Sequence, residues 1–226
     1  AVREVLRYPS VESVTLVELD PALTRLFSQQ PALTRLNDHA PLSPKVKVVN
    51  ADPFQWLDNN PEVFDVVIVD FPDPTNFSIG KLYSNSFYAL LDQHLSASGY
   101  AVIQTTSPLV ARRSYWTVVT TLESVGLRTA PYHTNVPSFG EWGFVIASRR
   151  PFSPLTQTGQ SGQAEPAGPL PTATPFPPGL RYLNPQTLPL LFDFPLAMGR
   201  VSAPVNRLSN QELVHSYEQE WGTVAH

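Results

Sequence analysis

Short runs of apolar and β-branched residues recur along the first 150 residues and alternate with amphipathic stretches. The apolar positions between the runs recur at helical spacing and predict helices over residues 2–8, 21–27, 83–95 and 107–125. Strands and helices in regular alternation predict an α/β domain built on a doubly wound, mostly parallel sheet. The runs themselves predict strands at residues 13–18, 46–50, 64–70, 100–105, 127–133 and 143–148.

Two features of these strands refine the expected sheet. The run Val66-Val67-Ile68-Val69 is apolar without alternation, which is typical of a strand covered on both faces. The last two predicted strands are separated by about nine residues that include Pro137 and Gly140, too few for a helical crossover. We therefore expect the sheet to end in an antiparallel hairpin.

Beyond residue 150 the alternating pattern is lost and prolines accumulate. Of the 24 prolines, twelve lie in residues 1–150 and twelve in the 54 residues 151–204. Residues 151–179 contain Glu165 as their only charge, a composition that predicts an extended or disordered linker. The catalytic part of the chain is accordingly expected within residues 1–150.

The last segment, residues 180–226, has a helix signal of its own. Ser209-Asn210-Gln211-Glu212 matches a capping box and predicts a helix that continues to about Trp221. We expect this segment to be a tail that docks on the domain or on a partner.

Composition excludes several classes of protein. Because the chain has no cysteine, it has no disulfide framework, no thiolate nucleophile and no cysteine zinc site, and no metal site is expected. A net charge of −4 without a basic cluster argues against a nucleic-acid surface and favours a neutral or cationic small molecule. No stretch approaches the roughly 18 consecutive apolar residues of a membrane span, so we expect this domain to be cytoplasmic.

Acidic residues follow three of the predicted strands. Glu18 ends the first, Asp52 with Pro53 follows the second, and Asp70 ends the third. Ligands of open α/β sheets bind at the carboxyl ends of strands, where one carboxylate can accept ribose hydroxyls and another an adenine amino group. The alternative is that Glu18 and Asp52 are carboxylates at helix N-termini, where first-turn prolines such as Pro21 and Pro53 are common.

Asp70 and Asp73 form the most informative pair, in the stretch Asp70-Phe71-Pro72-Asp73-Pro74. The two prolines fix two φ angles and limit the movement of the carboxylates relative to each other. Two nearby carboxylates attract a diamine cation, and one of them can take a proton from an amine nucleophile. A plain Asp-Pro turn remains the alternative.

These motifs, taken in order over residues 1–149, resemble the polyamine aminopropyltransferases, the spermidine synthase family. Residues 180–221 resemble the tail of bacterial members whose full-length chains carry an N-terminal membrane region. The motifs are Val17-Glu18-Leu19-Asp20-Pro21, Asn50-Ala51-Asp52-Pro53-Phe54, Asp70-Phe71-Pro72-Asp73-Pro74, Lys81-Leu82-Tyr83 with Phe87-Tyr88, Gln104-Thr105-Thr106-Ser107-Pro108, and the run from Pro137 to Phe144.

The resemblance implies a class I S-adenosylmethionine-dependent, Rossmann-like fold. It also implies transfer of an aminopropyl group from decarboxylated S-adenosylmethionine, a co-substrate, to putrescine, with no prosthetic group. The products would be spermidine and methylthioadenosine.

The resemblance also assigns roles to single residues. Glu18 would bind the ribose, and Asp52 with Pro53 the adenine. Asp70 would accept the proton, and both Asp70 and Asp73 would bind the amine. Tyr83 and Gln104 would be walls of the amine pocket or ordinary packing residues. A homo-oligomer is expected, with contact to the inner membrane only through a missing N-terminal region.

Two departures from the family pattern qualify these expectations. No glycine precedes Gly80, so the Gly-rich loop that carries the donor is absent, and the central first strand is expected to be missing with it. Strands beside that gap would be left unpaired, and the isolated chain is therefore expected to be unstable or inactive. Val136 also stands before Pro137 where the family has a tyrosine, which leaves the amine acceptor open.

Two other functions remain open at this point. A class I methyltransferase shares the sheet and the acidic strand ends, but it has no general need for a paired carboxylate loop that fits a diamine. The second alternative is a non-catalytic binding domain descended from the synthases, which the absence of the donor loop makes possible.

Overall fold

A computed structural model describes residues 1–153, 168–169 and 179–223. The chain divides into two compact units, one of residues 1–60 with 175–180 and one of residues 61–174 with 181–226. The predicted linker, residues 151–179, lies largely outside the described residues, and the expected boundaries at 150 and 179 remain predictions. Within the described ranges, no helix is long and apolar enough to cross a membrane.

The first unit is built around a two-stranded parallel sheet. β1 pairs with β2 in register from Val14 opposite Val46 to Glu18 opposite Asn50. Prolines occupy the first turns of its three longer helices, where the missing N–H costs nothing. Its elements are α1 (Val2–Val5), β1 (Val14–Glu18), α2 (Pro21–Gln29), α3 (Pro31–Leu36), the 3₁₀ helix η1 (Ala40–Leu42), β2 (Val46–Asn50) and α4 (Pro53–Asn59).

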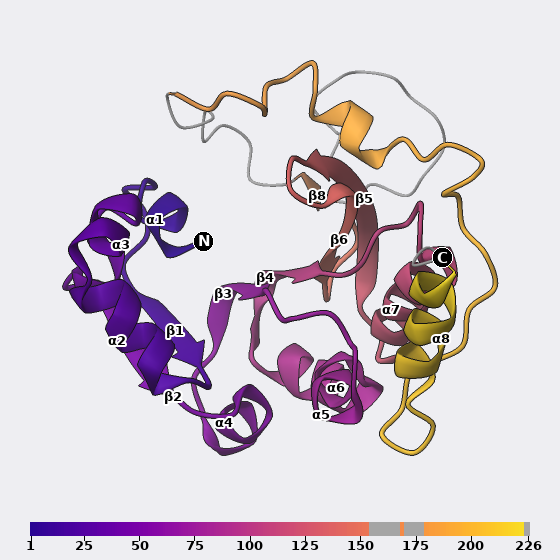
Figure 1. Cartoon of the computed structure of the whole chain (residues 1–226), viewed down its shortest axis with the longest axis horizontal. Helices are drawn as coiled ribbons and strands as arrows, with labels where there is room; N and C mark the ends of the chain where they lie inside the picture. Colours follow the sequence, from indigo (N-terminus) through magenta and orange to yellow (C-terminus); the bar gives the residue numbers. More distant parts are fainter. Residues whose placement is uncertain (154–167, 170–178, 224–226) are drawn as a thin grey trace. The chain divides into compact units, whose positions relative to one another are not determined.

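The second unit holds a mixed four-stranded sheet in the order β3-β4-β6-β5 (Figure 1). β3 and β4 are parallel, and β6 is antiparallel to both of its neighbours. Its strands are β3 (Phe64–Val69), β4 (Leu95–Gln104), β5 (Arg128–Val136) and β6 (Gly140–Ser148), with the two-residue pair β7 (Phe152–Ser153) and β8 (Gly168–Pro169). Its helices are α5 (Phe77–Gly80), η2 (Lys81–Tyr83), α6 (Asn85–Gln93), α7 (Arg112–Ser124), η3 (Pro189–Phe192) and α8 (Glu212–Gly222).

The predicted fold class and the terminal hairpin are confirmed, with corrections to the strands. β5 and β6 pair antiparallel, but three residues, 137–139, connect them in place of nine. β3 is not covered on both faces, because Val66 and Ile68, which share one face, are 60% and 46% exposed. Among the described residues, β1 and β2 form a sheet of their own, and the expected lack of a central strand stays a prediction.

Four helix predictions were wrong at their ends, and the first of these helices, expected over residues 2–8, already ends at Val5. The stretch 83–95 is divided at Ser84, whose Oγ accepts the Phe87 N–H and so starts α6. α7 begins at Arg112, five residues after the predicted start. Ser209 does not cap α8, which begins at Glu212.

The first N–H groups of α8 donate to asparagine side-chain oxygens, and the predicted capping box does not form. The Glu212 N–H donates to Asn210 Oδ1 at 3.3 Å, and the Leu213 N–H donates to Asn206 Oδ1 at 3.1 Å. Asn206 is fully buried and also donates to the Gly80 carbonyl, at 3.1 Å. The side chain of Asn206 therefore joins α8 to the end of α5.

α8 packs beside α7 in the second unit (Figure 1). A Cβ on Gly80 would lie 2.5 Å from Val214 Cγ2 of α8, so glycine permits this close approach. The core next to it contains large side chains that are fully buried: Tyr88, Leu91, Ile103, Tyr115, Val119, Leu122, Val145 and Leu213.

Candidate functional site

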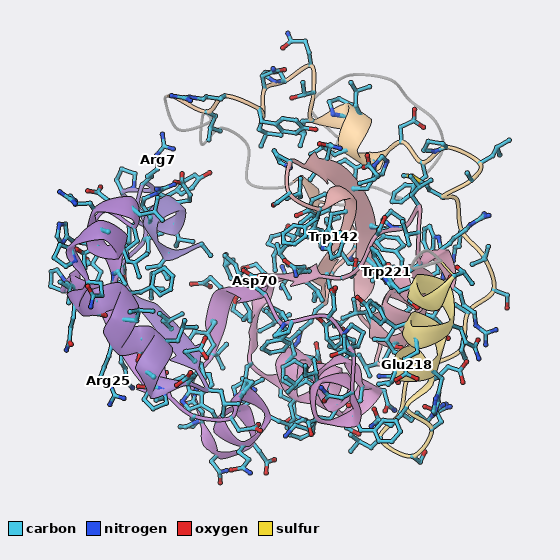
Figure 2. The ribbon with its side chains drawn as sticks, viewed as in Figure 1. Arg7, Arg25, Asp70, Trp142, Glu218 and Trp221 are labelled. Carbon is cyan, nitrogen blue, oxygen red and sulfur yellow. The ribbon has the colours of Figure 1, made fainter. Side chains whose placement is uncertain are left out.

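The acidic loop directly follows β3 in the second unit. Asp70 is exposed at the end of the strand, and Pro74, four residues later, is buried. Because β3 and β4 run parallel, with Val69 opposite Ile103, Gln104 reaches the same edge of the sheet. Figure 2 shows Asp70 at this edge.

Two side chains hold the backbone of this loop. The Tyr83 hydroxyl donates to the carbonyls of Pro72, at 3.1 Å, and Phe71, at 3.3 Å. Gln104 Nε2 also donates to the Phe71 carbonyl, at 3.3 Å. Tyr83 is only 1% exposed, so its contacts are with the loop and the core, and it presents almost no surface to a ligand.

Asp73 is the half-buried carboxylate of the loop. Its Oδ2 accepts a hydrogen bond from the Tyr217 hydroxyl of α8 at 2.7 Å. Its Oδ1 is buried and has no hydrogen-bond partner among the described residues. An acceptor in this state carries a desolvation cost that a bound N–H donor would relieve.

Burial sets the protonation behaviour of this cluster. Burial raises the pKa of Asp73 above its ordinary value, and the hydrogen bond from Tyr217 opposes part of that rise. Burial raises the pKa of Tyr217 well above 10, and the hydrogen bond to Asp73 adds to the rise, so Tyr217 remains a hydroxyl donor. Burial, together with the charges of Asp73 and Asp70, also raises the pKa of Tyr83 above its ordinary value.

The arrangement suits recognition of a cation. Asp70 is open to solvent, whereas Asp73 is held by a neutral phenol that leaves its negative charge uncancelled. No lysine or arginine in the described ranges forms an ion pair with Asp73. The described part of the chain also contains no cluster of three or more histidine or acidic side chains that could hold a metal ion.

In the first unit, Glu18 and Asp52 lie at the carboxyl ends of neighbouring parallel strands. Glu18 Oε1 accepts the Asp20 N–H at 2.9 Å, and Asp20, not Glu18, caps α2. Asp52 Oδ1 accepts the N–H groups of Phe54 and Gln55, so Asp52 caps α4 with Pro53 in its first turn. The structural role weighed for Asp52 is therefore present, and ligand binding by these residues stays a prediction.

Sequence reasoning missed an aromatic group that α8 brings beside the acidic loop. The ring centroid of Trp221 lies 5.9 Å from that of Tyr217 and 6.1 Å from that of Trp142 on β6 (Figure 2). The Trp221 indole N–H donates to Thr106 Oγ1 at 3.1 Å. The spacing of Tyr217 and Trp221 could have indicated this group, because residues four apart on a helix share a face.

The sequence profile of the spermine/spermidine synthase domain matches residues 1–156. The chain is 50% identical over 226 residues to polyamine aminopropyltransferase 2 of Ralstonia nicotianae, covering 99% of this chain and 41% of that protein. It is 45% identical over 224 residues to the polyamine aminopropyltransferase of Leptospira interrogans, again covering 99% and 41%. The chain thus spans about two fifths of the length of these relatives.

Solved structures support the fold. The spermidine synthase from Thermotoga maritima aligns with a TM-score of 0.62 at 22% identity, covering 85% of this chain and 61% of that one. A spermidine synthase in complex with the transition state analogue AdoDATO aligns with a TM-score of 0.63, also at 22% identity, covering 85% and 62%. Because the profile of the spermine/spermidine synthase domain matches more than half of its residues, the chain belongs to the spermine/spermidine synthase family.

Proposed function

We propose that the protein transfers an aminopropyl group from decarboxylated S-adenosylmethionine to putrescine, giving spermidine and methylthioadenosine. The observation that carries this proposal is the acidic loop after β3, with Asp70 exposed and one buried oxygen of Asp73 unpartnered. The names of the relatives, which are polyamine aminopropyltransferases, support the same reaction.

The proposed chemistry needs little beyond alignment and proton removal. An alkylammonium with a pKa of about 10 is not nucleophilic, so the site must bind the cation and then take its proton. Asp73 binds the ammonium and Asp70 accepts the proton as the amine nitrogen attacks the methylene carbon next to the sulfonium. A C–N bond forms, the C–S bond breaks, and sulfur keeps the electron pair in methylthioadenosine.

The donor is assigned to residues at the carboxyl ends of β1 and β2. Glu18 would accept the ribose hydroxyls, and Asp52 with Pro53 would contact the adenine. Their position at strand ends supports this assignment, because nucleosides bind α/β sheets there. Glu18→Gln should therefore raise the KM for the donor more than the KM for the amine.

The proposal extends to the whole protein. It includes a homo-oligomer, a cytoplasmic catalytic domain with a C-terminal tail, and an anchor in the inner membrane through a further N-terminal region. Light scattering of the purified protein and membrane fractionation of cells test these parts separately from the chemistry.

The reaction is tested by incubating the full-length protein with putrescine and, in separate reactions, decarboxylated S-adenosylmethionine and S-adenosylmethionine. Mass spectrometry of the products should show spermidine with the first donor only. Methylated product alone would replace the proposal with a methyltransferase. No product with either donor would leave a binding domain.

Asp70→Asn tests the assigned proton acceptor. We expect the rate to fall roughly 100- to 10,000-fold, the usual range for loss of a general base. Asp65→Asn is the matched control, because Asp65 is an exposed aspartate on β3 of the same strand-and-loop segment. An Asp70→Asn enzyme as active as this control would remove Asp70 from the mechanism.

A further inference from the structure

α8 reaches the acidic loop from 144 residues away in the sequence. The hydrogen bond from the Tyr217 hydroxyl to Asp73 Oδ2, 2.7 Å long, is the contact that joins them. It leaves Oδ1 as the oxygen without a partner. One oxygen of the carboxylate is therefore fixed by the tail, and the other remains to accept a donor.

We propose that the C-terminal helix completes the amine site, with Tyr217 as the positioning residue that orients Asp73 toward the ammonium of the substrate. This inference rests on the proposed function and adds a residue to it. Tyr217 lies outside residues 1–149, which contain the motifs that resemble the family. The tail then acts as part of the site and not only as a covering segment.

The chemistry of a phenol fits this role. An arginine or lysine beside Asp73 would orient the carboxylate but would also cancel the charge that attracts a cation. Tyr217 supplies one hydroxyl donor, and its raised pKa keeps the proton on the phenol oxygen. Asp73 is thus held in one orientation with its charge available for the amine.

Several contacts hold α8 firmly enough for a positioning role. Glu220 lies near the C-terminal end of α8, beyond Tyr217. Its carboxylate accepts the backbone N–H of Arg113 at 2.7 Å and that of Ser114 at 2.9 Å. At the other end of the helix, the buried Asn206 accepts the N–H of Leu213. Both ends of α8 are therefore bound to the second unit, and Tyr217 lies between them.

Tyr217→Phe removes the hydroxyl and keeps the ring. Putrescine binding to the full-length protein, measured by calorimetry, should weaken roughly tenfold, as expected for a hydrogen bond to a charged group. In turnover assays the KM for putrescine should rise while the KM for the donor stays unchanged.

The pH profile separates positioning from packing. Among the described residues, the titratable groups around Asp73 are Tyr217, which donates to it, Tyr83, whose pKa its charge raises, and Asp70 in the same loop; the two tyrosines have pKa values too high to titrate in the acid range. Because the hydrogen bond from Tyr217 lowers the pKa of Asp73, its removal should shift the acid limb of kcat/KM for putrescine to higher pH.

Two control variants complete the experiment. Tyr182→Phe removes the hydroxyl of an exposed tyrosine and should change nothing. Ser216→Ala removes a buried hydroxyl from α8 that bonds Glu212 and not Asp73, so it reports the effect of merely loosening the helix. We expect its KM for putrescine and its acid limb to match wild type.

The outcomes distinguish this inference from the proposed function. If Tyr217→Phe binds putrescine as wild type does, or if wild type does not bind putrescine, the inference is wrong. If wild type binds putrescine and Tyr217→Phe weakens binding but no aminopropyl transfer occurs, the inference stands and the proposed reaction fails.

Discussion

Asp73 illustrates how a residue suited to binding a cation lowers stability. Burial favours its neutral form, and the surrounding phenols supply only one hydrogen bond to oppose that preference. In the folded chain the carboxyl holds its proton more tightly than in the unfolded chain. Ionisation of Asp73 in the folded state therefore costs free energy, which a bound ammonium would offset.

Asp73→Asn should show this cost as a pH-dependent gain in stability. Since the folded pKa is raised, wild-type stability falls as pH rises through the interval between the unfolded and folded pKa values, and the asparagine variant lacks that fall. The difference in melting temperature, variant minus wild type, should therefore increase as pH rises above about 4, the ordinary pKa of an aspartate. Tryptophan fluorescence is a suitable probe, because Trp116, Trp142 and Trp221 all lie in the second unit.

The same variant should bind putrescine roughly 10- to 100-fold more weakly, because a charged acceptor is replaced by a neutral one. A gain in stability together with a loss of putrescine binding would identify Asp73 as a carboxylate that binds the substrate. A melting-temperature difference that shrinks with rising pH would contradict the raised pKa.

Single residues show which parts of the site the sequence could predict. Asp70 and Asp73 could be proposed as a pair because two prolines and two carboxylates in five residues carry their own chemical meaning, and their roles stay predictions. The cap formed by Asp52 was a stated alternative, since a local proline marks it. Tyr217 was not found, because its contact with Asp73 depends on how a distant helix packs.

Among the helices, α7 depends on another helix for its N-terminal cap. Its N-cap residue, Ala111, has no side chain that can accept a hydrogen bond. The Glu220 carboxylate of α8 accepts the N–H groups of Arg113 and Ser114 and the Ser114 hydroxyl instead. A carboxylate at the C-terminal end of α8 is unfavourable for that helix alone, so its position is explained by the N-terminus of α7.

Glu220→Ala should therefore destabilise the second unit by about 1–2 kcal/mol, the usual cost of losing an N-cap. Glu218→Ala is the matched control on the same helix, because Glu218 is exposed (Figure 2). Its removal takes an unfavourable charge from the end of α8 and should leave stability unchanged or slightly raised. Urea unfolding of both variants checks the difference, and equal losses would exclude the cap.

Among the strands, the runs of β-branched residues predicted the ends of β1 and β2 to within one residue. β4 begins five residues before its predicted start, because an irregularity separates its first residue from the regular ladder: Leu95 pairs with Phe64, and the next pair is Tyr100 with Val66. The start of α8 was misplaced for a related reason. Its first N–H groups are satisfied by Asn206 and Asn210, whose positions depend on the loop before the helix.

The two units differ in how much core they contain. In residues 1–60 only Thr34, Ala40 and Leu57 are buried, whereas the fully buried large side chains all belong to the second unit. The described part of the first unit also exposes large apolar side chains: Tyr8, Leu19, Leu23, Leu26, Leu36, Leu42, Val48 and Leu180. A two-stranded sheet with so little buried surface is marginally stable by itself.

Hydrogen–deuterium exchange of residues 1–226, expressed alone, should therefore resolve two levels of protection. Amides of β1 and β2 should exchange rapidly through local opening, because within the described residues each strand pairs on one side only. Amides of β4 and β6 should be protected best, since both strands are paired on two sides. The full-length protein is the control, in which β1 and β2 should gain protection if the expected central strand covers their open edge. Uniform, cooperative protection of both sheets in the 226-residue chain would show that it needs no such strand.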